Sequence, residues 1–215
     1  MLKGWLFALA VLALCAGVLA AEPPAGPDLA PAAAPSTPAG KLPTTRAEMA
    51  VTVARALAGG DEKVPPAPLR ASYWDVRPGH WAFRYIEYAK SMEVVSGYAD
   101  GSFRPEAPVN RAQMAVFLAR ALVAPQGDSG LIGYRPTLLP TFTDVSPDFW
   151  AYAHIEYLTE PVRKIAQGNP DGSYHPEQWC TRDDLTALLA RAFPPPKPPA
   201  PAPLHEQDSP GAAGG

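Results

Sequence analysis

A five-residue stretch occurs three times in this chain, as TRAEM at residues 45–49, NRAQM at residues 110–114 and TRDDL at residues 181–185. Apolar residues follow each copy at the three- and four-residue spacing of a single helix face. A motif that recurs together with its surroundings is typical of repeat architecture, in which each copy packs on its neighbours. The stretch therefore predicts a repeat architecture with three equivalent helices.

The first and fourth residues of each copy are those of a capping box. In this motif the N-cap side chain accepts a hydrogen bond from the backbone three residues later, and the side chain of that later residue reaches back to the cap. The pairs that fit the motif are Thr45 with Glu48, Asn110 with Gln113, and Thr181 with Asp184. We therefore place three helix starts at these caps.

Cys180 precedes the third cap, at the position that Val109 occupies before the second. An apolar residue there can pack on the fourth helical residue as a hydrophobic staple. We expect Val109 against Met114 and Cys180 against Leu185, which makes Cys180 a buried, inert thiol rather than a reactive one.

Two of the copies have a further half before the capped helix. Residues 72–123 and 141–193 each contain an Asp-Val pair, a Trp-Ala pair, an Ile-Glu-Tyr run and an Asp-Gly turn in the same order. We expect a first helix that begins near Pro78 or Pro147, because proline is tolerated in an opening turn. Copy one, residues 42–58, contains only the capped helix.

Aromatic residues form a stripe on that first helix, where Trp81, Tyr85 and Tyr88 recur at helical spacing. Such a stripe favours core packing over an exposed sugar-binding platform. Glu87 and Glu156 recur at equivalent positions of two copies. Recurrence of this kind indicates architecture rather than one asymmetric active site.

The Asp-Gly turns at residues 100–101 and 171–172 also echo the middle of an EF-hand calcium loop. The closing position of such a loop would be Ala107 or Gln178, and neither supplies a bidentate carboxylate. Glycine in such a turn takes backbone angles that other residues avoid, and aspartate bonds its own backbone. We therefore expect structural turns without a metal.

No constellation typical of catalysis is apparent. The four histidines show no paired metal-binding spacing, and neither a nucleophile elbow nor a phosphate loop occurs. We predict a protein that is not an enzyme, with no catalytic residues and no cofactor.

Each copy places an arginine directly after its cap: Arg46, Arg111 and Arg182. A cation at this position opposes the helix dipole, so helix construction does not require it. One interpretation is a structural salt bridge to a partner such as Asp75 or Asp144. The other is an anion site, in which the guanidinium and free helix amides converge on one carboxylate. The residues alone leave both interpretations open.

Both ends of the chain have their own composition. Residues 1–20 have the charged start, short apolar run and small-residue end of a secretory signal. Acylation of Cys15 is disfavoured, because the residue before it is not small. Residues 21–41 and 194–215 are rich in Pro, Ala and Gly, so we expect a disordered linker and tail.

The chain has 215 residues and a formal net charge of −3, without a run of Lys or Arg. This excludes a nucleic-acid-binding arm and a polybasic membrane patch. Once the signal is cleaved, we expect no transmembrane span. The segment 124–140 is long for a connection between repeats, and long loops are functional or are linkers.

Taken together, the motifs resemble the S-layer homology (SLH) family, above all in GYADGSFRPE at residues 97–106 followed by the capped helix. The resemblance implies a mostly α fold, with helix-loop-helix SLH repeats in a pseudo-threefold arrangement around a central three-helix bundle. It implies a secreted, non-catalytic protein at the cell wall, S-layer or periplasm-facing envelope that binds acidic, pyruvylated cell-wall polysaccharide. The binding residues that it implies are Arg46, Arg111, Arg182, Trp81, Trp150, Gly97, Tyr98, Asp100, Gly168 and Asp171.

Three departures from the family pattern bear on these sites. Copy one lacks its first half, Arg182 is followed by Asp183 and Asp184, and Asn169 stands where copy two has Tyr98. We therefore rank Arg46 and Arg111 above Arg182 and expect two binding sites at most. The alternative function is a protein-binding scaffold of the envelope, which docks another protein through the SLH grooves or the Pro-rich tails.

Overall fold

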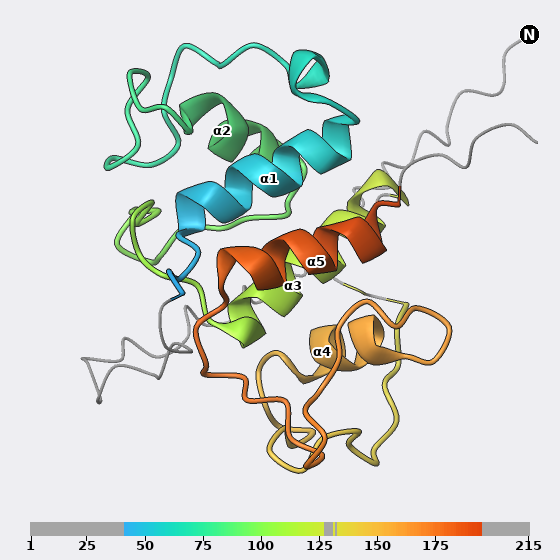
Figure 1. Ribbon diagram of the computed structural model, residues 1–215. Helices are drawn as coiled ribbons and strands as arrows, with labels where there is room; N and C mark the ends of the chain where they lie inside the picture. The colour runs from blue at the N-terminus through green and yellow to red at the C-terminus, as the bar shows by residue number, and fades with distance from the viewer. Residues whose placement is uncertain (1–40, 127–130, 132, 195–215) are drawn as a thin grey trace, which may run out of the picture.

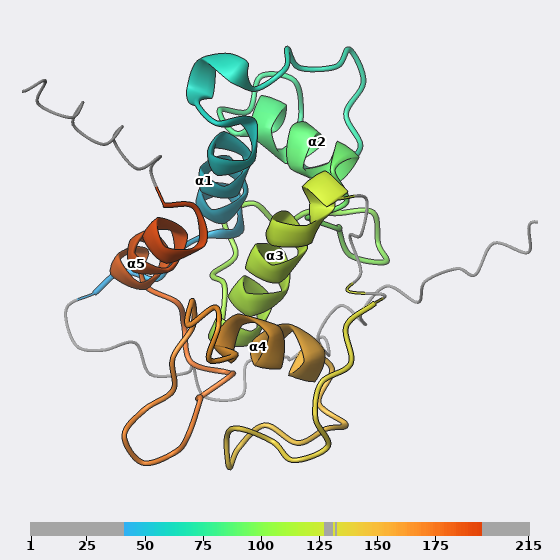
Figure 2. The same ribbon diagram turned by 90° about the vertical axis from the view of Figure 1, so that its right-hand side faces the viewer.

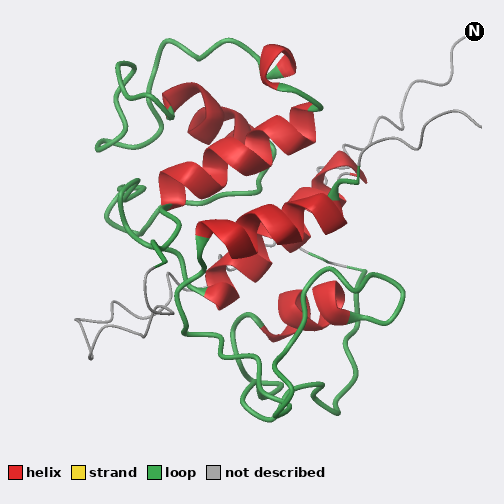
Figure 3. Cartoon of the chain, viewed as in Figure 1, coloured by secondary structure: helices red, strands yellow, loops and turns green. Residues whose placement is uncertain are grey.

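The computed structural model describes residues 41–126, 131 and 133–194 (Figure 1). The predicted signal at residues 1–20 lies outside them, as do the linker apart from Lys41 and the tail apart from Pro194. The described elements are α1 (Arg46–Ala58), η1 (Asp61–Lys63), α2 (Phe83–Ser91), α3 (Arg111–Val123), η2 (Ala124–Gln126), α4 (Tyr152–Thr159) and α5 (Arg182–Ala192). These residues contain helices and loops but no strand, so the predicted mostly α class is confirmed (Figure 3).

The three capped helices α1, α3 and α5 contact one another at the centre of the molecule. Helix α2 packs on α1 and helix α4 packs on α3, on opposite sides of the central three (Figures 1 and 2). Each first helix therefore packs on the capped helix of the preceding copy. Helix α5 has no such partner among the described helices, because copy one has no first half. None of these helices is both long and apolar enough to cross a membrane.

All three predicted capping boxes are present. At α1, for example, the Thr45 hydroxyl accepts a hydrogen bond from Glu48 N at 3.2 Å, and Thr45 N donates to Glu48 Oε2 at 3.0 Å. The sequence places the starts of α1, α3 and α5 correctly because these bonds span only three residues.

The residues just before the caps form a closed ring of backbone hydrogen bonds. Thr44 N donates to Cys180 O at 2.8 Å, Cys180 N donates to Val109 O at 2.8 Å, and Val109 N donates to Thr44 O at 2.9 Å. The ring holds the three helix starts together. Cys180 is fully buried, and burial raises the pKa of its thiol to about 12. The predicted burial of this thiol is thus confirmed, and a raised pKa disfavours the reactive thiolate.

The first helices begin later than we expected, at Phe83 and Tyr152 rather than near the two prolines. In copy two, His80 N donates to Arg77 O at 2.8 Å and Phe83 N donates to His80 O at 3.0 Å. These bonds span three residues and form turns, so the α-helical pattern starts only after them.

Because Trp81 precedes the helix, it does not follow the helical spacing. It is 57% exposed, and the core face consists of Phe83, Ile86 and Ala89 instead. The prediction of a Trp-Tyr core stripe was wrong for Trp81.

The inter-repeat loop packs on the third copy. Leu131 is buried, the Tyr134 ring meets the Tyr157 ring edge-to-face at 5.3 Å, and the Tyr152 hydroxyl donates to Thr137 O at 2.6 Å. These contacts show that part of the segment 124–140 covers α4.

Candidate functional site

Arg46 reaches from the start of α1 into the turn of copy two. Its Nε donates to Phe103 O at 2.7 Å, and its Nη2 donates to Ser96 O at 3.0 Å. The guanidinium carbon lies 4.9, 4.6 and 5.3 Å from the ring centroids of Tyr98, Phe103 and Phe117. We call these five residues the Arg46 site.

Arg111 makes the same contacts one copy later. Its Nε donates to Tyr174 O at 2.9 Å, its Nη2 donates to Gln167 O at 3.0 Å, and its guanidinium carbon lies 4.5 Å from the Tyr174 ring centroid. We call Arg111, Gln167 and Tyr174 the Arg111 site. Both sites therefore lie where the capped helix of one copy meets the turn of the next.

The predicted aspartate partners of these arginines have another role. Asp75 accepts hydrogen bonds from Phe103 N at 2.8 Å and Arg104 N at 2.7 Å. Asp144 accepts from Tyr174 N and His175 N, both at 2.7 Å. Each carboxylate holds the backbone that supplies the arginine's carbonyl acceptor, so the salt-bridge interpretation was wrong for Arg46 and Arg111.

The other interpretation also needs correction, because the helix amides are occupied. Arg46 N donates to Ala107 O at 2.9 Å and Ala47 N donates to Pro105 O at 2.8 Å. In α3 the corresponding amides donate to Gln178 O and Pro176 O, both at 2.9 Å. A carboxylate ligand would therefore meet the guanidinium without free helix amides beside it.

The turns have the tight geometry that the sequence predicted. A Cβ added to Gly97 would lie 2.6 Å from Ser102 O, and one added to Gly168 would lie 2.7 Å from Ser173 O. Only glycine fits such a close approach. Gly101 has φ +80°, which is the left-handed region where glycine is unstrained.

The aspartates of these turns shape the backbone. Asp100 accepts hydrogen bonds from Ser102 N at 2.9 Å and Ser102 Oγ at 2.6 Å, and these bonds lower its pKa to about 2. Asp171 accepts from Ser173 N at 2.9 Å and Ser173 Oγ at 2.5 Å, and its pKa is lowered for the same reason. Both groups are therefore charged at neutral pH.

Sequence reasoning missed two residues beside the Arg46 site. The Arg104 guanidinium carbon lies 4.0 Å from the Tyr98 ring centroid, and Arg104 forms an ion pair with Asp100 at 3.1 Å. Trp74 is 66% exposed and donates from Nε1 to Asp100 O at 3.2 Å. A signal for Arg104 was present, because His175 holds the same place between an aromatic residue and a proline. Arg104 and His175 also both have positive φ, a strained conformation for residues other than glycine.

The two sites differ in exposure. Arg46 is only 4% exposed, and burial lowers the pKa of its guanidinium from the ordinary value. Arg111 is partly exposed. Asn169, which replaces Tyr98 in copy three, bonds Ser173 Oγ at 3.1 Å instead of covering the guanidinium with a ring.

Arg182 differs from both. Its Nη2 donates to Glu48 Oε1 of α1, and the Arg182 side chain is 57% exposed. A salt bridge is thus present at the third arginine, although to a partner that sequence reasoning did not name. Copy one has no turn that could receive this guanidinium.

The predicted tryptophans lie outside these contacts. Trp81 stacks on His80 with a centroid distance of 5.8 Å, and Trp150 lies 5.7 Å from the Phe149 ring. Within the described part of the chain, no ring contact joins either tryptophan to Arg46 or Arg111. Their role in ligand binding stays a prediction.

Comparison with known proteins identifies the repeat. The family described as S-layer homology domain matches residues 72–115 and 141–186. The chain belongs to the S-layer homology family. Each matched SLH region runs from the loop before α2 or α4 into the next capped helix, whereas α1 precedes the first match.

The SLH chain is similar to much longer proteins. It is 33% identical over 155 residues to Cell surface glycoprotein 1 of Acetivibrio thermocellus, covering 69% of this chain and 6% of that protein. It is 29% identical to the Cellulosome-anchoring protein of the same organism, over 69% of this chain and 32% of that protein. It is 25% identical to S-layer protein EA1 of Bacillus anthracis, over 60% of this chain and 14% of that protein. The SLH chain therefore spans less than a third of the length of each.

Proposed function

We propose that this SLH protein is a non-catalytic component of the cell envelope, whose repeats bind cell-wall polysaccharide and hold the chain at the bacterial surface. The names of its relatives support attachment to the envelope, since they describe cell-surface, cellulosome-anchoring and S-layer proteins. The resemblance to the family suggests an acidic polymer with pyruvyl ketals, whose carboxylates can form charge-assisted hydrogen bonds with a guanidinium.

This proposal rests on the incomplete hydrogen bonding and the partial exposure of Arg111. Two hydrogen bonds to carbonyl oxygens hold its guanidinium through Nε and Nη2. Its Nη1 bonds no residue of the described chain, and the side chain is partly exposed. Carbonyl acceptors leave the positive charge uncompensated, so Nη1 can donate a charge-assisted hydrogen bond to a carboxylate.

The Arg46 site is proposed as a second, more enclosed contact. Its cation lies behind Tyr98, while Asp100 and Arg104 form the exposed part of the turn. Gly97, Gly168 and Asp171 shape the turns at the two sites. Arg182 is the weakest candidate, because Glu48 already compensates its charge. Trp81 and Trp150 are proposed to contact sugar rings.

Binding to purified wall sacculi tests the proposal, with sacculi used before and after mild acid removal of ketal pyruvate. We expect Arg111→Ala to reduce binding at least tenfold and pyruvate removal to do the same. Arg191→Ala removes the same charge from the last turn of α5 and serves as the matched control. Thermal unfolding of both variants separates a binding defect from a folding defect.

Binding that survives both Arg111→Ala and pyruvate removal would overturn the polysaccharide proposal. Retention through a wall protein, shown by loss of binding after protease treatment of the sacculi, would favour the protein-docking alternative instead.

A further inference from the structure

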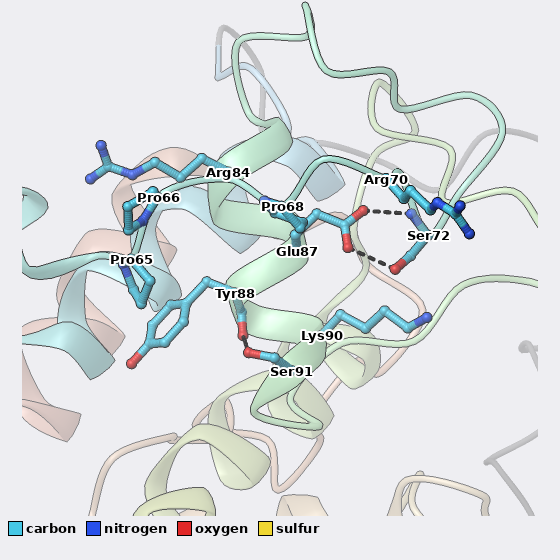
Figure 4. Close-up of a pocket in the computed structure, with 10 residues that line it drawn as sticks. All are labelled: Pro65, Pro66, Pro68, Arg70, Ser72, Arg84, Glu87, Tyr88, Lys90 and Ser91. Atoms are coloured by element: carbon cyan, nitrogen blue, oxygen red, sulfur yellow. Dashed lines mark hydrogen bonds between the residues drawn. The ribbon is translucent and has the colours of Figure 1, made fainter.

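A cavity of about 540 Å³ lies between α2 and the proline-rich segment that precedes it (Figure 4). Pro65, Pro66 and Pro68 form one wall. Arg84, Glu87, Tyr88, Lys90 and Ser91 of α2 form the other, and Arg70 and Ser72 complete the lining. We call this cavity the proline groove.

The proline groove has an excess of positive charge. Arg70, Arg84 and Lys90 line it, with Glu87 as the single carboxylate. Both oxygens of Glu87 are occupied, because they accept hydrogen bonds from Ser72 N and Ser72 Oγ, each at 2.7 Å (Figure 4). This excess occurs in a chain whose formal net charge is −3. The lining therefore suits an anion.

None of the three cations forms a direct ion pair with a carboxylate of the described residues, although that of Asp61 lies near Arg84. Arg84 donates from Nη2 to the carbonyl oxygen of Asp61, and its buried Nε has no hydrogen-bond partner in the described chain. The Lys90 ammonium lies 5.2 Å from the Tyr73 ring centroid, and Arg70 is exposed. Carbonyl and ring contacts do not compensate a positive charge as a paired carboxylate does, so these cations can attract an anionic ligand.

The lining and the volume of the groove limit which class of ligand it can bind. Prolines have no N–H to donate, so an extended peptide could not pair its backbone along the wall of Pro65, Pro66 and Pro68. The volume falls within the range of small-molecule pockets and exceeds the size of a single inorganic anion. Proline rings and the Tyr88 side chain offer the apolar surface on which a sugar ring can pack.

We propose that the proline groove binds a short anionic saccharide, with carboxylate or phosphate groups on Arg84 and Lys90 and sugar rings against the prolines. This site is separate from the Arg46 site. Arg84 lies beside Asp61, which follows the end of α1, whereas Arg46 begins that helix. The length of α1, roughly 18 Å at a rise of 1.5 Å per residue, separates Arg84 from Arg46. At the other end of the groove, the Tyr73 and Phe103 rings lie between Lys90 and Arg46.

Comparison with copy three shows which groove residues belong to the repeat architecture and which occur only in copy two. Its Glu156 accepts hydrogen bonds from Thr141 N and Oγ1 at 2.9 and 2.6 Å, as Glu87 does from Ser72. This carboxylate bond is therefore part of the repeat architecture. The cations are not, because Ala153 and Thr159 stand at the positions of Arg84 and Lys90.

Titration of the ¹⁵N-labelled full chain, followed by NMR, tests the proposal. The probes are trigalacturonate for carboxylate, trehalose 6-phosphate for phosphate, and neutral maltotriose. We expect either anionic probe to shift the amide signals of Arg70, Ser72 and Lys90 while maltotriose does not. The stronger probe then identifies the preferred anion.

The double variant Arg84→Ala/Lys90→Thr, which introduces the copy-three residues, is expected to weaken binding at least tenfold. Lys63→Thr/Arg77→Ala removes two exposed charges outside the groove lining and should leave affinity unchanged. If the double variant unfolds, Arg70→Glu at an exposed position makes the same test.

Three results would overturn the proposal: shifts confined to residues around Arg46 and Arg111, equal binding of maltotriose, or tighter binding of hexaglutamate than of both anionic sugars. Loss of wall binding in Arg111→Ala with unchanged shifts in the proline groove would separate this site from the proposed wall-binding function.

Discussion

Helices α3 and α5 begin with the same motif, yet their outer faces differ. In α3 this face is apolar and fully or almost fully buried, with Ala112, Ala115, Val116 and Ala119. In α5 the equivalent residues are Asp183, Thr186, Ala187 and Ala190, and all four are exposed. Helix α3 packs against α4, whereas copy one has no first half to cover α5. The motif builds a helix, and the neighbouring half-repeat determines whether an arginine site forms beside it.

Exchanging residues between these two helix faces is expected to have the largest effect on stability. Ala112→Asp/Ala115→Thr places the α5 residues at two fully buried positions of α3. We expect the free energy of unfolding to fall by about 4 kcal/mol, because a buried, unpaired carboxylate is costly. Urea unfolding measures this loss.

The reverse exchange, Asp183→Ala/Thr186→Ala, is its matched control on the exposed face. It should change the free energy of unfolding by less than about 1 kcal/mol, since it removes only an exposed ion pair with Lys41 and an exposed hydrogen bond from Thr186 Oγ1 to Arg182 O. A comparable loss in both variants would contradict the difference between the two faces.

His154 in α4, the helix that packs on α3, makes the stability of the fold depend on pH. Neither ring nitrogen has a hydrogen-bond partner in the described chain, and burial together with nearby Arg120 lowers the pKa to about 4. The unfolded chain binds the proton more tightly, at its ordinary pKa of 6.5. The neutral ring therefore stabilises the fold fully above pH 6.5, and this contribution is lost as pH falls towards 4.

We expect His154→Phe to remove up to about 3 kcal/mol of the stability difference between pH 7 and pH 4. Chemical unfolding at both pH values measures it. The control is Tyr85→Phe at the equivalent position of α2, where the hydroxyl donates to Asp61 Oδ1 at 2.6 Å. An unchanged pH dependence in His154→Phe would show that other groups cause the acid sensitivity.

The smallest effect is expected at Arg182. Arg182→Ala breaks an exposed ion pair with Glu48, so the free energy of unfolding should change by less than about 1 kcal/mol. Wall binding should remain, in contrast to Arg111→Ala. A tenfold loss of wall binding in Arg182→Ala would place a third functional site at α5. This result would contradict the conclusion that the three copies differ in function.

Local features of the candidate site were predictable. The Gly97 and Gly168 turns depend on bonds between residues four apart or fewer, such as Tyr98 N to Ser102 O at 2.7 Å. The positions of Arg46 and Arg111 followed from the repeat. Their acceptors did not, because Arg46 bonds Phe103 O and Ser96 O, which lie 57 and 50 residues further along the chain.

The sequence alone determined the capped helices, the turns and the inequality of the copies, because each depends on short-range hydrogen bonds or on which half-repeats are present. Only the tertiary structure decided that α2 packs on α1 and that the arginines bond carbonyls rather than aspartates. It also decided that Trp81 is exposed and that cations gather at the proline groove. These features join residues far apart in sequence, and packing selects among partners that no local pattern distinguishes.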